Sequence, residues 1–330
     1  MSKRHIHFLW VKSEFGAGTW GAALGPDAIQ FAALNRGLTL FSQHPNTVID
    51  ETENTLRIDP NPDPETGRAH HLNNILPVIE QVCRATTGIL QAGSFPFIIA
   101  GDHSNAAGTI AGLRAAYPDE RLGVIWIDAH ADVHSPYTSP SGNVHGMPLA
   151  ASLGLRALEA VEGYTPPAES GLAAVSDRVA ALWEQLCHVG GVFPKLHNED
   201  LVFIGIRDYE PAEQYIIESQ GIRHYVPQQI NRLGLDRVVA ETYEYLKHCD
   251  RLYVSFDIDS LDKQLVPGTG TPVGHGLTPD QAQYLLAQFW AAPHLAAIEF
   301  TEINPLLDVG NQTAEIALEC IETLLKTPHA

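Results

Sequence analysis

The sequence predicts an α/β fold, in which helices cover both faces of a parallel sheet. Two observations predict it: short, almost continuously apolar runs recur along the 330 residues, and helix-length amphipathic segments separate them. Parallel strands are buried on both faces and therefore read as unbroken apolar runs. Regular alternation of strand and helix then favours one sheet joined by right-handed crossovers.

The apolar runs expected to be strands are 5–11, 95–100, 122–127, 201–206, 222–226, 251–256 and 295–301. Helical patterns cover 76–91, 106–117, 211–219, 236–248, 279–289 and 313–325. No internal repeat and no Gly/Ser or Pro linker divides the chain, so a single domain over 1–330 is expected.

Two stretches depart from this alternation of predicted strands and helices. Residues 46–69 are polar and Pro-rich, and we expect them to form a surface excursion. Residues 152–200 are a long connection between two strands. Because 172–187 has helical periodicity, this connection is expected to be an inserted helix with loops.

Composition excludes several classes of protein. The net charge is −19, from 20 Lys+Arg against 39 Asp+Glu, whereas a nucleic-acid or anionic-membrane binder needs a basic surface. The sign instead suits a cationic substrate. The first residues indicate a strand and not a signal peptide, no run approaches the ~18 apolar residues of a membrane span, and a cytoplasmic protein is expected.

The four cysteines are widely spaced and form no CxxC motif: Cys83, Cys187, Cys249 and Cys320. In a chain of this size such cysteines are typical of reduced thiols and not of a disulfide framework.

Acidic and histidine residues follow three of the predicted strands. They are His103 after 95–100, then Asp128, His130 and Asp132 after 122–127, and Asp257 and Asp259 after 251–256. Alternate side chains of an extended segment share one face, so each group is expected to point one way. Functional groups of an open parallel sheet gather outside the carboxyl ends of its strands. The three groups are therefore expected to converge.

The convergence of these side chains predicts a metal site. Four carboxylates at the edge of an apolar sheet repel one another and lose hydration, unless cations compensate. Two divalent ions about 3.5–4 Å apart, bridged by carboxylates, supply that charge. Oxygen-rich ligands with one histidine per ion and no thiolate favour Mn²⁺ over Zn²⁺, with Fe²⁺, Co²⁺ and Ni²⁺ as open alternatives.

With these motifs in place, the sequence resembles the arginase/agmatinase (ureohydrolase) family over nearly the whole chain. The motifs are GDHS (101–104), DAHAD (128–132), SGNVHGMP (141–148), SFDIDSLD (255–262), PGTGTP (267–272) and EINP (302–305). The resemblance implies a three-layer α/β/α sandwich around a mostly parallel, eight-stranded sheet. It also implies hydrolysis of L-arginine to L-ornithine and urea by a hydroxide that bridges two Mn²⁺ ions.

The resemblance further assigns roles to individual residues. One ion would be held by His103, Asp128, Asp132 and Asp257, and the other by Asp128, His130, Asp257 and Asp259. The catalytic residues would be Asp132, which orients the nucleophile and carries a proton, Glu302, which pairs with the guanidinium, and His145, which shuttles protons. Thr271 would add a polar contact to the substrate. A homo-oligomer, a trimer or a hexamer, is also implied.

The amino-acid end of the substrate is matched by a separate set of positions. They are Ser139, Ser141 and Asn143 in one loop, with His134, and Glu210 and Glu213 after another strand. The chain departs from the arginase pattern at His134, where Asn is usual, and at Glu210, where Asp is usual. Lys263 and His275 are further departures, expected to lie outside the contacts with the metals. The substrate is therefore less firmly indicated than urea-forming chemistry.

Three alternatives remain open at this point. In the first alternative, the chain is another ureohydrolase, which acts on agmatine, guanidinobutyrate or a related guanidino compound. In the second alternative, the chain is a dinuclear hydrolase of a phosphoester or an amide, although the carboxylate of Glu302 would repel a phosphate. In a different class, it is a catalytically silent, metal-stabilised scaffold. A comparison of urea release from several guanidino compounds separates arginase from the first alternative, and Asp132→Asn separates an enzyme from a scaffold.

Overall fold

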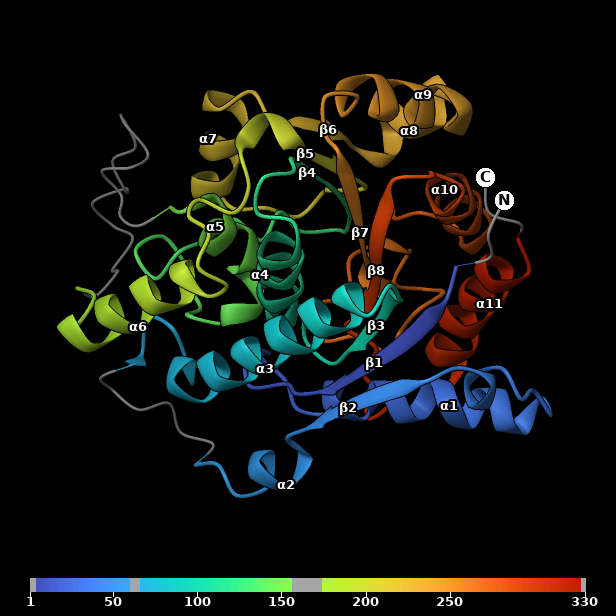
Figure 1. Ribbon diagram of the computed structural model, residues 1–330, viewed down its shortest axis with the longest axis horizontal. Helices are drawn as coiled ribbons and strands as arrows, with labels where there is room; N and C mark the ends of the chain where they lie inside the picture. Colours follow the sequence, from blue (N-terminus) through green and yellow to red (C-terminus); the bar gives the residue numbers. More distant parts are fainter. Residues whose placement is uncertain (1–3, 60–65, 156–173, 328–330) are drawn as a thin grey trace.

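The computed structural model describes residues 4–59, 66–155 and 174–327 and contains one sheet with helices on both sides (Figure 1). Its eight strands all pair in parallel, in the order β2-β1-β3-β8-β7-β4-β5-β6. The strands are β1 (Ile6–Lys12), β2 (Asn46–Asp50), β3 (Phe95–Ala100), β4 (Leu122–Ile127), β5 (Leu201–Ile204), β6 (Arg223–Tyr225), β7 (Arg251–Asp257) and β8 (Leu295–Thr301). The predicted three-layer parallel fold is confirmed.

Helices form a layer on each face of the sheet, and each layer has its own apolar core. One core contains side chains of α3 (Leu72–Gln91), α4 (Ala106–Ala116), α5 (Pro148–Leu153), α6 (Asp177–His188) and α7 (Pro211–Ser219). The other contains α1 (Gly25–Asn35), α8 (Pro227–Leu233), α9 (Leu235–Tyr245), α10 (Pro279–Trp290) and α11 (Gln312–Lys326). Successive residues of a strand enter opposite cores, as Ile125 and Trp126 of β4 do.

All seven predicted strands are present, and the runs 95–100, 122–127 and 295–301 match their strands at both ends. The prediction of a surface excursion over 46–69 is wrong for its first residues, which form the edge strand β2; α2 (Thr52–Thr55) follows. Only Ile49 of β2 is buried, so an edge strand with exposed side chains left no apolar run to recognise.

Three helices of the outer layers, α1, α5 and α8, were not predicted, whereas the inserted helix was. α1 has Ile29, Ala32 and Ala33 on its buried side, at helical spacing, but its short apolar side chains give a weak pattern. α8 likewise has few buried residues. α6 lies within the segment predicted as an inserted helix, and the first two residues of the predicted helical stretch, 172–173, lie outside the described residues.

Two further expectations can be compared with the described residues. The four cysteines are buried and form no disulfide, as predicted for reduced thiols. Within the ranges given above, no helix combines the length and the apolar composition needed to cross a membrane.

The contact between α3 and α4 depends on glycines and yields a test of this packing. A Cβ added at Gly112 would lie 2.6 Å from Thr86 Cβ and 2.8 Å from the carbonyl oxygen of Cys83, whereas one added at Gly88 would meet nothing within 4 Å. We expect Gly112→Ala to lower the free energy of unfolding by about 1–3 kcal/mol through overpacking. Gly88→Ala, the control within α3, should raise it by about 0.5–1 kcal/mol. Urea denaturation measures both, and a Gly112→Ala variant as stable as the control would contradict the packing.

Candidate metal centre and substrate pocket

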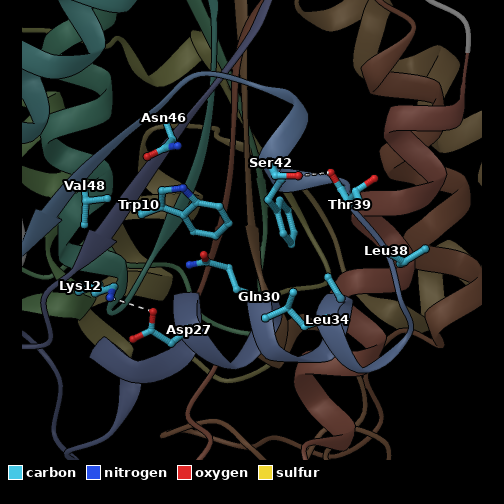
Figure 2. Close-up of a pocket in the computed structure, with 12 residues that line it drawn as sticks. Trp10, Lys12, Asp27, Gln30, Leu34, Leu38, Thr39, Ser42, Asn46 and Val48 are labelled. Carbon is cyan, nitrogen blue, oxygen red and sulfur yellow. Dashed lines mark hydrogen bonds and ion pairs between the residues drawn. The ribbon is translucent and has the colours of Figure 1, made fainter.

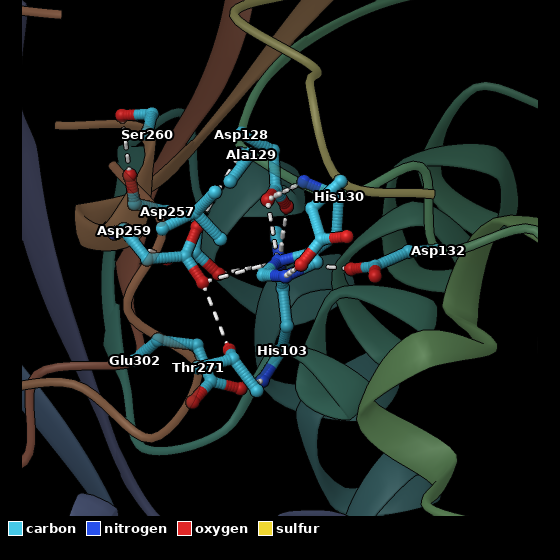
Figure 3. Close-up of polar contacts among 12 residues, drawn as sticks. His103, Asp128, Ala129, His130, Asp132, Asp257, Asp259, Ser260, Thr271 and Glu302 are labelled. Carbon is cyan, nitrogen blue, oxygen red and sulfur yellow. Dashed lines mark hydrogen bonds and ion pairs between the residues drawn. The ribbon is translucent and has the colours of Figure 1, made fainter. Parts of the chain in front are cut away.

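Three segments far apart in the sequence meet at the carboxyl ends of the central strands (Figure 3). His103 starts the short 3₁₀ helix after β3, Asp128 follows β4 directly, and Asp257 is the last residue of β7. These strands lie within the stretch β3-β8-β7-β4 of the sheet order, so their ends share one edge. The predicted convergence of the three groups is therefore present in the fold.

The local reason for this convergence differs from the one predicted. Asp132 has a φ of 53°, in the left-handed region, and Asp259 lies in the 3₁₀ helix Ile258–Ser260. In each turn the first carboxylate accepts from the backbone: Asp128 Oδ1 from the His130 N–H at 2.7 Å, and Asp257 Oδ1 from the Asp259 N–H at 2.7 Å. The expectation of extended segments with alternating side chains is wrong here, because tight turns bring the side chains together.

His103 lies at the centre of the first group of side chains. Its Nδ1 is 3.0 Å from Asp128 Oδ2, 3.1 Å from Asp132 Oδ2 and 3.1 Å from Asp257 Oδ2. His103 and the three carboxylates are all buried. One nitrogen and three oxygens therefore face a common point from three different loops.

His130 forms a second group on the same carboxylates. Its Nδ1 is 3.1 Å from Asp259 Oδ2 and 3.5 Å from Asp128 Oδ1. Asp128 thus presents one oxygen to each group. Ligand atoms of Asp128, His130 and Asp259, and separately those of His103, Asp128 and Asp132, lie within 4.8 Å of one another. Two adjacent ions that share a carboxylate fit this arrangement.

The donor atoms at the centre of the first group support a cation there. His103 Nδ1 and Asp128 Oδ2 are buried and make no hydrogen bond within the described part of the chain, although they are 3.0 Å apart. A buried nitrogen and a buried carboxylate oxygen without partners are costly in an apolar interior. A cation between them would satisfy both, so the residues present fit a metal ion.

Burial and mutual repulsion alter the acidity of the carboxyl groups in the cluster. Burial raises the pKa of Asp132 to about 6, with a further contribution from Asp128. Burial likewise raises the pKa of Asp257, with Asp259 and Asp128 adding to it. Burial would lower the pKa of His103, but the adjacent carboxylates of Asp128, Asp132 and Asp257 raise it well above its usual value. Without cations, the cluster therefore keeps protons.

Glu302 and His145 form a pair at the side of the cluster. Glu302 has a φ of 66° and follows β8, and its Oε1 accepts from the His103 backbone N–H at 2.8 Å. The same oxygen is 3.0 Å from His145 Nδ1. Burial would lower the pKa of His145, but the Glu302 carboxylate raises it to about 9. His145 is therefore a cation that holds Glu302 as an anion at neutral pH.

A cavity of about 260 Å³ opens above the cluster and contains nearly all the predicted site residues. It is lined by His103, His130, Asp132, His134, Ser139, Ser141, Asn143, His145, Gly146, Asp208, Glu210, Glu213, Asp257, Thr271 and Glu302. Of the predicted metal ligands, Asp128 and Asp259 are not among these residues, and both are almost fully buried. All the predicted catalytic and substrate-binding residues line the cavity.

The two departures from the arginase pattern contact each other on one wall of this cavity. His134 Nε2 is 2.5 Å from Glu210 Oε2 and 3.5 Å from Glu213 Oε2. The hydrogen bond from His134 lowers the pKa of Glu210 to about 2, whereas burial raises the pKa of Glu213 to about 7. Glu210 precedes α7, and its backbone N–H donates to Glu213 Oε2 at 3.1 Å. A donor and two acids thus lie side by side.

The SGN loop supplies neutral polar groups to the cavity. Ser139 Oγ accepts from the Gly142 N–H at 2.9 Å, and Ser141 Oγ accepts from the Asn143 N–H at 3.2 Å. Gly142 has a φ of 76°, which favours glycine, and this turn holds the loop. Thr271 donates its hydroxyl to Asp259 Oδ2 at 3.0 Å, so it contacts the acidic cluster as well as the cavity.

Asp208 lines the cavity but was not among the predicted site residues. Its Oδ2 is 3.9 Å from His130 Nε2, and it stands two positions before Glu210 in the same RDYEPAE segment. The sequence signal that could have identified Asp208 was its spacing, because it is an acidic residue two positions before Glu210. Lys263 and His275, expected to lie away from the metal contacts, are not among the lining residues.

A second cavity, of about 360 Å³, lies between α1 and the strands β1 and β2 (Figure 2). Its charged pair is Lys12 and Asp27, with Lys12 Nζ 2.8 Å from Asp27 Oδ1, and it contains none of the predicted site residues. A further cluster of Asp200, His248 and Cys249 is already neutralised, since Arg121 Nε donates to both oxygens of Asp200. Neither place matches the first cavity as a candidate catalytic site.

Comparison with known proteins finds a family and relatives that match nearly the whole chain. The model of the arginase family matches residues 5–326. Arginase of Bacillus subtilis (strain 168) is 33% identical over 320 residues, covering 97% of each chain, and arginase of Bacillus caldovelox is 35% identical over 321 residues, again covering 97% of each.

Solved structures of arginases share the fold along the whole chain. Native arginase from Bacillus caldovelox superposes with a TM-score of 0.79 at 33% identity, covering 99% of both chains. Arginase of Entamoeba histolytica in complex with L-ornithine gives a TM-score of 0.79 at 25% identity, covering 99% of this chain and 100% of that one.

The protonated state of the cluster leads to a test that needs no substrate. Because Asp132 and Asp257 have raised pKa values, and the pKa values of His103 and His130 are raised too, a cation must displace protons as it binds. We expect the apparent affinity for Mn²⁺ to rise with pH, by about tenfold per pH unit for each proton displaced. Calorimetric titration in buffers of different ionisation enthalpy counts those protons. An affinity that is constant or falls between pH 5 and 8 would contradict this description.

Proposed function

The chain belongs to the arginase family, and on that premise we propose that it hydrolyses the guanidino group of L-arginine to L-ornithine and urea at a pair of Mn²⁺ ions. One observation carries the proposal: the buried His and Asp cluster lies at the floor of a cavity whose walls hold the buried carboxylate of Glu302 and a set of polar and acidic side chains. The activity makes the chain a hydrolase of a C–N bond.

We propose that the two groups of side chains hold one ion each. His103, Asp128, Asp132 and Asp257 would bind the first, and Asp128, His130, Asp257 and Asp259 the second. The distances within each group and the donor atoms without partners support this division. Oxygen-rich ligands favour Mn²⁺, with Co²⁺, Fe²⁺ and Ni²⁺ as the alternatives. When bound, the two metal ions would act as Lewis acids that lower the pKa of a water molecule towards neutrality.

Glu302 is proposed to fix the guanidinium over the metal centre. The carboxylate is buried, and although burial alone would raise its pKa, His145 lowers it, so Glu302 is anionic. A buried anion at the cavity wall attracts a planar cation and accepts its N–H groups, which orients the guanidinium carbon. The backbone N–H of His103 and the ring of His145 keep the carboxylate in place.

His145 and Asp132 are proposed to move the protons of the reaction. Cleavage of the C–N bond requires a proton on the departing amine of ornithine. Asp132 lines the cavity beside His103, and its raised pKa suits a group that accepts a proton and gives it up. His145 is protonated at neutral pH and is 15% exposed, so it can exchange protons with solvent and resupply the site.

The walls of the cavity favour a substrate with an α-amino-acid end. We propose that Ser139, Ser141, Asn143 and His134 donate to the α-carboxylate, and that Glu210 and Glu213 receive the α-ammonium. His134 and Glu210 bond to each other, so a zwitterion would insert between a donor and an acceptor that already face one another. Agmatine lacks the carboxylate and would leave these donors without partners, which penalises it.

Assembly is proposed from the family resemblance alone, and location from the sequence analysis. We propose a homo-oligomer, a trimer or hexamer, that acts in the cytoplasm with a small guanidino compound as its substrate and without nucleic acid or membrane.

Substrate choice is tested by urea release from L-arginine, agmatine and 4-guanidinobutyrate after incubation with Mn²⁺. We expect L-arginine to give the highest kcat/KM, because only it satisfies both ends of the cavity. Asn143→Ala should lower kcat/KM for L-arginine by about tenfold or more and leave agmatine nearly unchanged, since the contact concerns the carboxylate. Agmatine or 4-guanidinobutyrate as the better substrate would refute the assignment of the amino-acid end.

The role of Glu302 is tested by removing its charge while keeping its size. Glu302→Gln should lower kcat/KM for L-arginine by about 10–100-fold, because a charge-assisted hydrogen bond to the guanidinium is lost. Mn²⁺ content should be unchanged, since Glu302 is not a proposed ligand. Glu218→Gln, which removes an exposed acid on α7, is the control for net charge. Equal kcat/KM values for the two variants would show that Glu302 does not pair with the substrate.

A further inference from the structure

The loop that follows β1 passes beside the SGN loop without lining the substrate cavity. A Cβ added at Gly18 of this loop would have three atoms of Asn143 as its nearest neighbours: Nδ2 at 2.6 Å, Cγ at 3.5 Å and Oδ1 at 3.9 Å. Asn143 lines the cavity, whereas no residue of the loop 16–21 does. Gly18 therefore adjoins the pocket through the side-chain amide of Asn143.

The loop 16–21 is held in place on both sides of Gly18. Before it, the Gly16 N–H donates to Asp102 Oδ2 at 2.9 Å. After it, the Gly21 N–H donates to Glu14 Oε2. Asp102 and Glu14 are both buried, so each provides a fixed acceptor. The backbone at Gly18 is therefore anchored and has little freedom to move away from a neighbour.

Asn143 is held by its backbone but not by its side chain. Its N–H donates to Ser141 Oγ at 3.2 Å, and the carbonyl oxygen of Gly142 before it accepts from the His70 N–H at 2.8 Å. The side-chain amide makes no hydrogen bond within the described part of the chain. Of the two groups that meet at Gly18, the Asn143 amide is therefore the one that can turn.

We propose that Gly18 is a specificity-determining residue, because the lack of a side chain there leaves the space that the Asn143 amide occupies. The inference rests on the proposed function, in which Asn143 donates to the α-carboxylate of the substrate. A methyl group at position 18 would overlap Nδ2 and turn the amide out of its place. The α-carboxylate would then lose a donor, whereas a ligand without that carboxylate would lose nothing.

A methyl group at Gly18 should cost the fold little. Gly18 is exposed, and its φ is not positive, so the backbone allows alanine. The atom that the methyl group would overlap is the end of a flexible side chain and not backbone. Gly21 in the same loop is different, because its φ is 123° and a Cβ there would lie 2.1 Å from Asn304 Oδ1. Alanine at position 18 is therefore a probe of substrate binding and not of folding.

The proposal is tested by urea release from L-arginine with Mn²⁺-loaded Gly18→Ala. We expect KM to rise by about three- to tenfold and kcat to stay within about twofold, because the lost contact lies away from the reacting group. The inhibition constant of L-ornithine should rise by a similar factor. That of putrescine, the same diamine without the carboxylate, should not change.

A control variant changes a different loop glycine. A Cβ at Gly274 would meet only Lys263 Cε, at 3.6 Å, and Gly274 does not line the cavity. Gly274→Ala should leave KM for L-arginine and both inhibition constants at the values of the parent chain.

A double-mutant cycle shows whether Gly18 acts through Asn143. In the Asn143→Ala chain, the shortened side chain leaves room for the methyl group. Gly18→Ala should therefore raise KM for L-arginine no further in that chain. A general effect on the fold would instead raise KM by the same factor with and without the Asn143 amide.

Any of three results would overturn the proposal: an unchanged KM in Gly18→Ala, equal weakening of L-ornithine and putrescine, or fully additive effects of Gly18→Ala and Asn143→Ala. A failure of the proposed function looks different. In that case the parent chain would release no urea from L-arginine, or Asn143→Ala alone would leave KM unchanged.

Discussion

Electrostatic repulsion among four buried aspartates is the constraint on which the rest of the structure depends. Asp128, Asp132, Asp257 and Asp259 approach one another at the ends of β4 and β7, and none is more than 6% exposed. An apolar sheet cannot solvate such a cluster, so protons or cations must neutralise it. The raised pKa values of Asp132 and Asp257 indicate that protons neutralise the cluster when no cation is bound. The buried donor atoms that face each other across the cluster fit neutralisation by cations.

The fold brings these acidic side chains together and also holds them in place. Strand order brings the ends of β3, β7 and β4 to one edge, and tight turns, rather than extended chain, aim the side chains inward. Close backbone packing is needed at that edge: a Cβ at Gly101 would lie 2.1 Å from the carbonyl oxygen of Ser13, so only glycine fits beside the first ligand loop. Beneath the cluster, Ser255 Oγ lies 2.7 Å from His103 Nε2, and the His103 ring stacks on Trp126. The cavity above it then needs only an acid for the guanidinium and polar groups for the other end of the substrate.

Much of this was predictable from sequence, because burial and charge leave clear patterns. Apolar runs identified seven of the eight strands, and acidic residues at the ends of the central ones identified the cluster. What was missed has weak or nonlocal patterns. β2 is an edge strand with one buried residue, and the turn at Asp132 depends on a positive φ that no spacing rule expresses. Asp208 was visible only as one more acid in an acidic segment.

Anomalous diffraction from crystals soaked in Mn²⁺, recorded at the manganese absorption edge, tests the central claim most directly. The account predicts two peaks about 3.5–4 Å apart, one beside His103 and the other beside His130, with Asp128 between them. Aspartates splayed apart, without anomalous density among them at saturating Mn²⁺, would contradict the claim that bound cations neutralise this cluster.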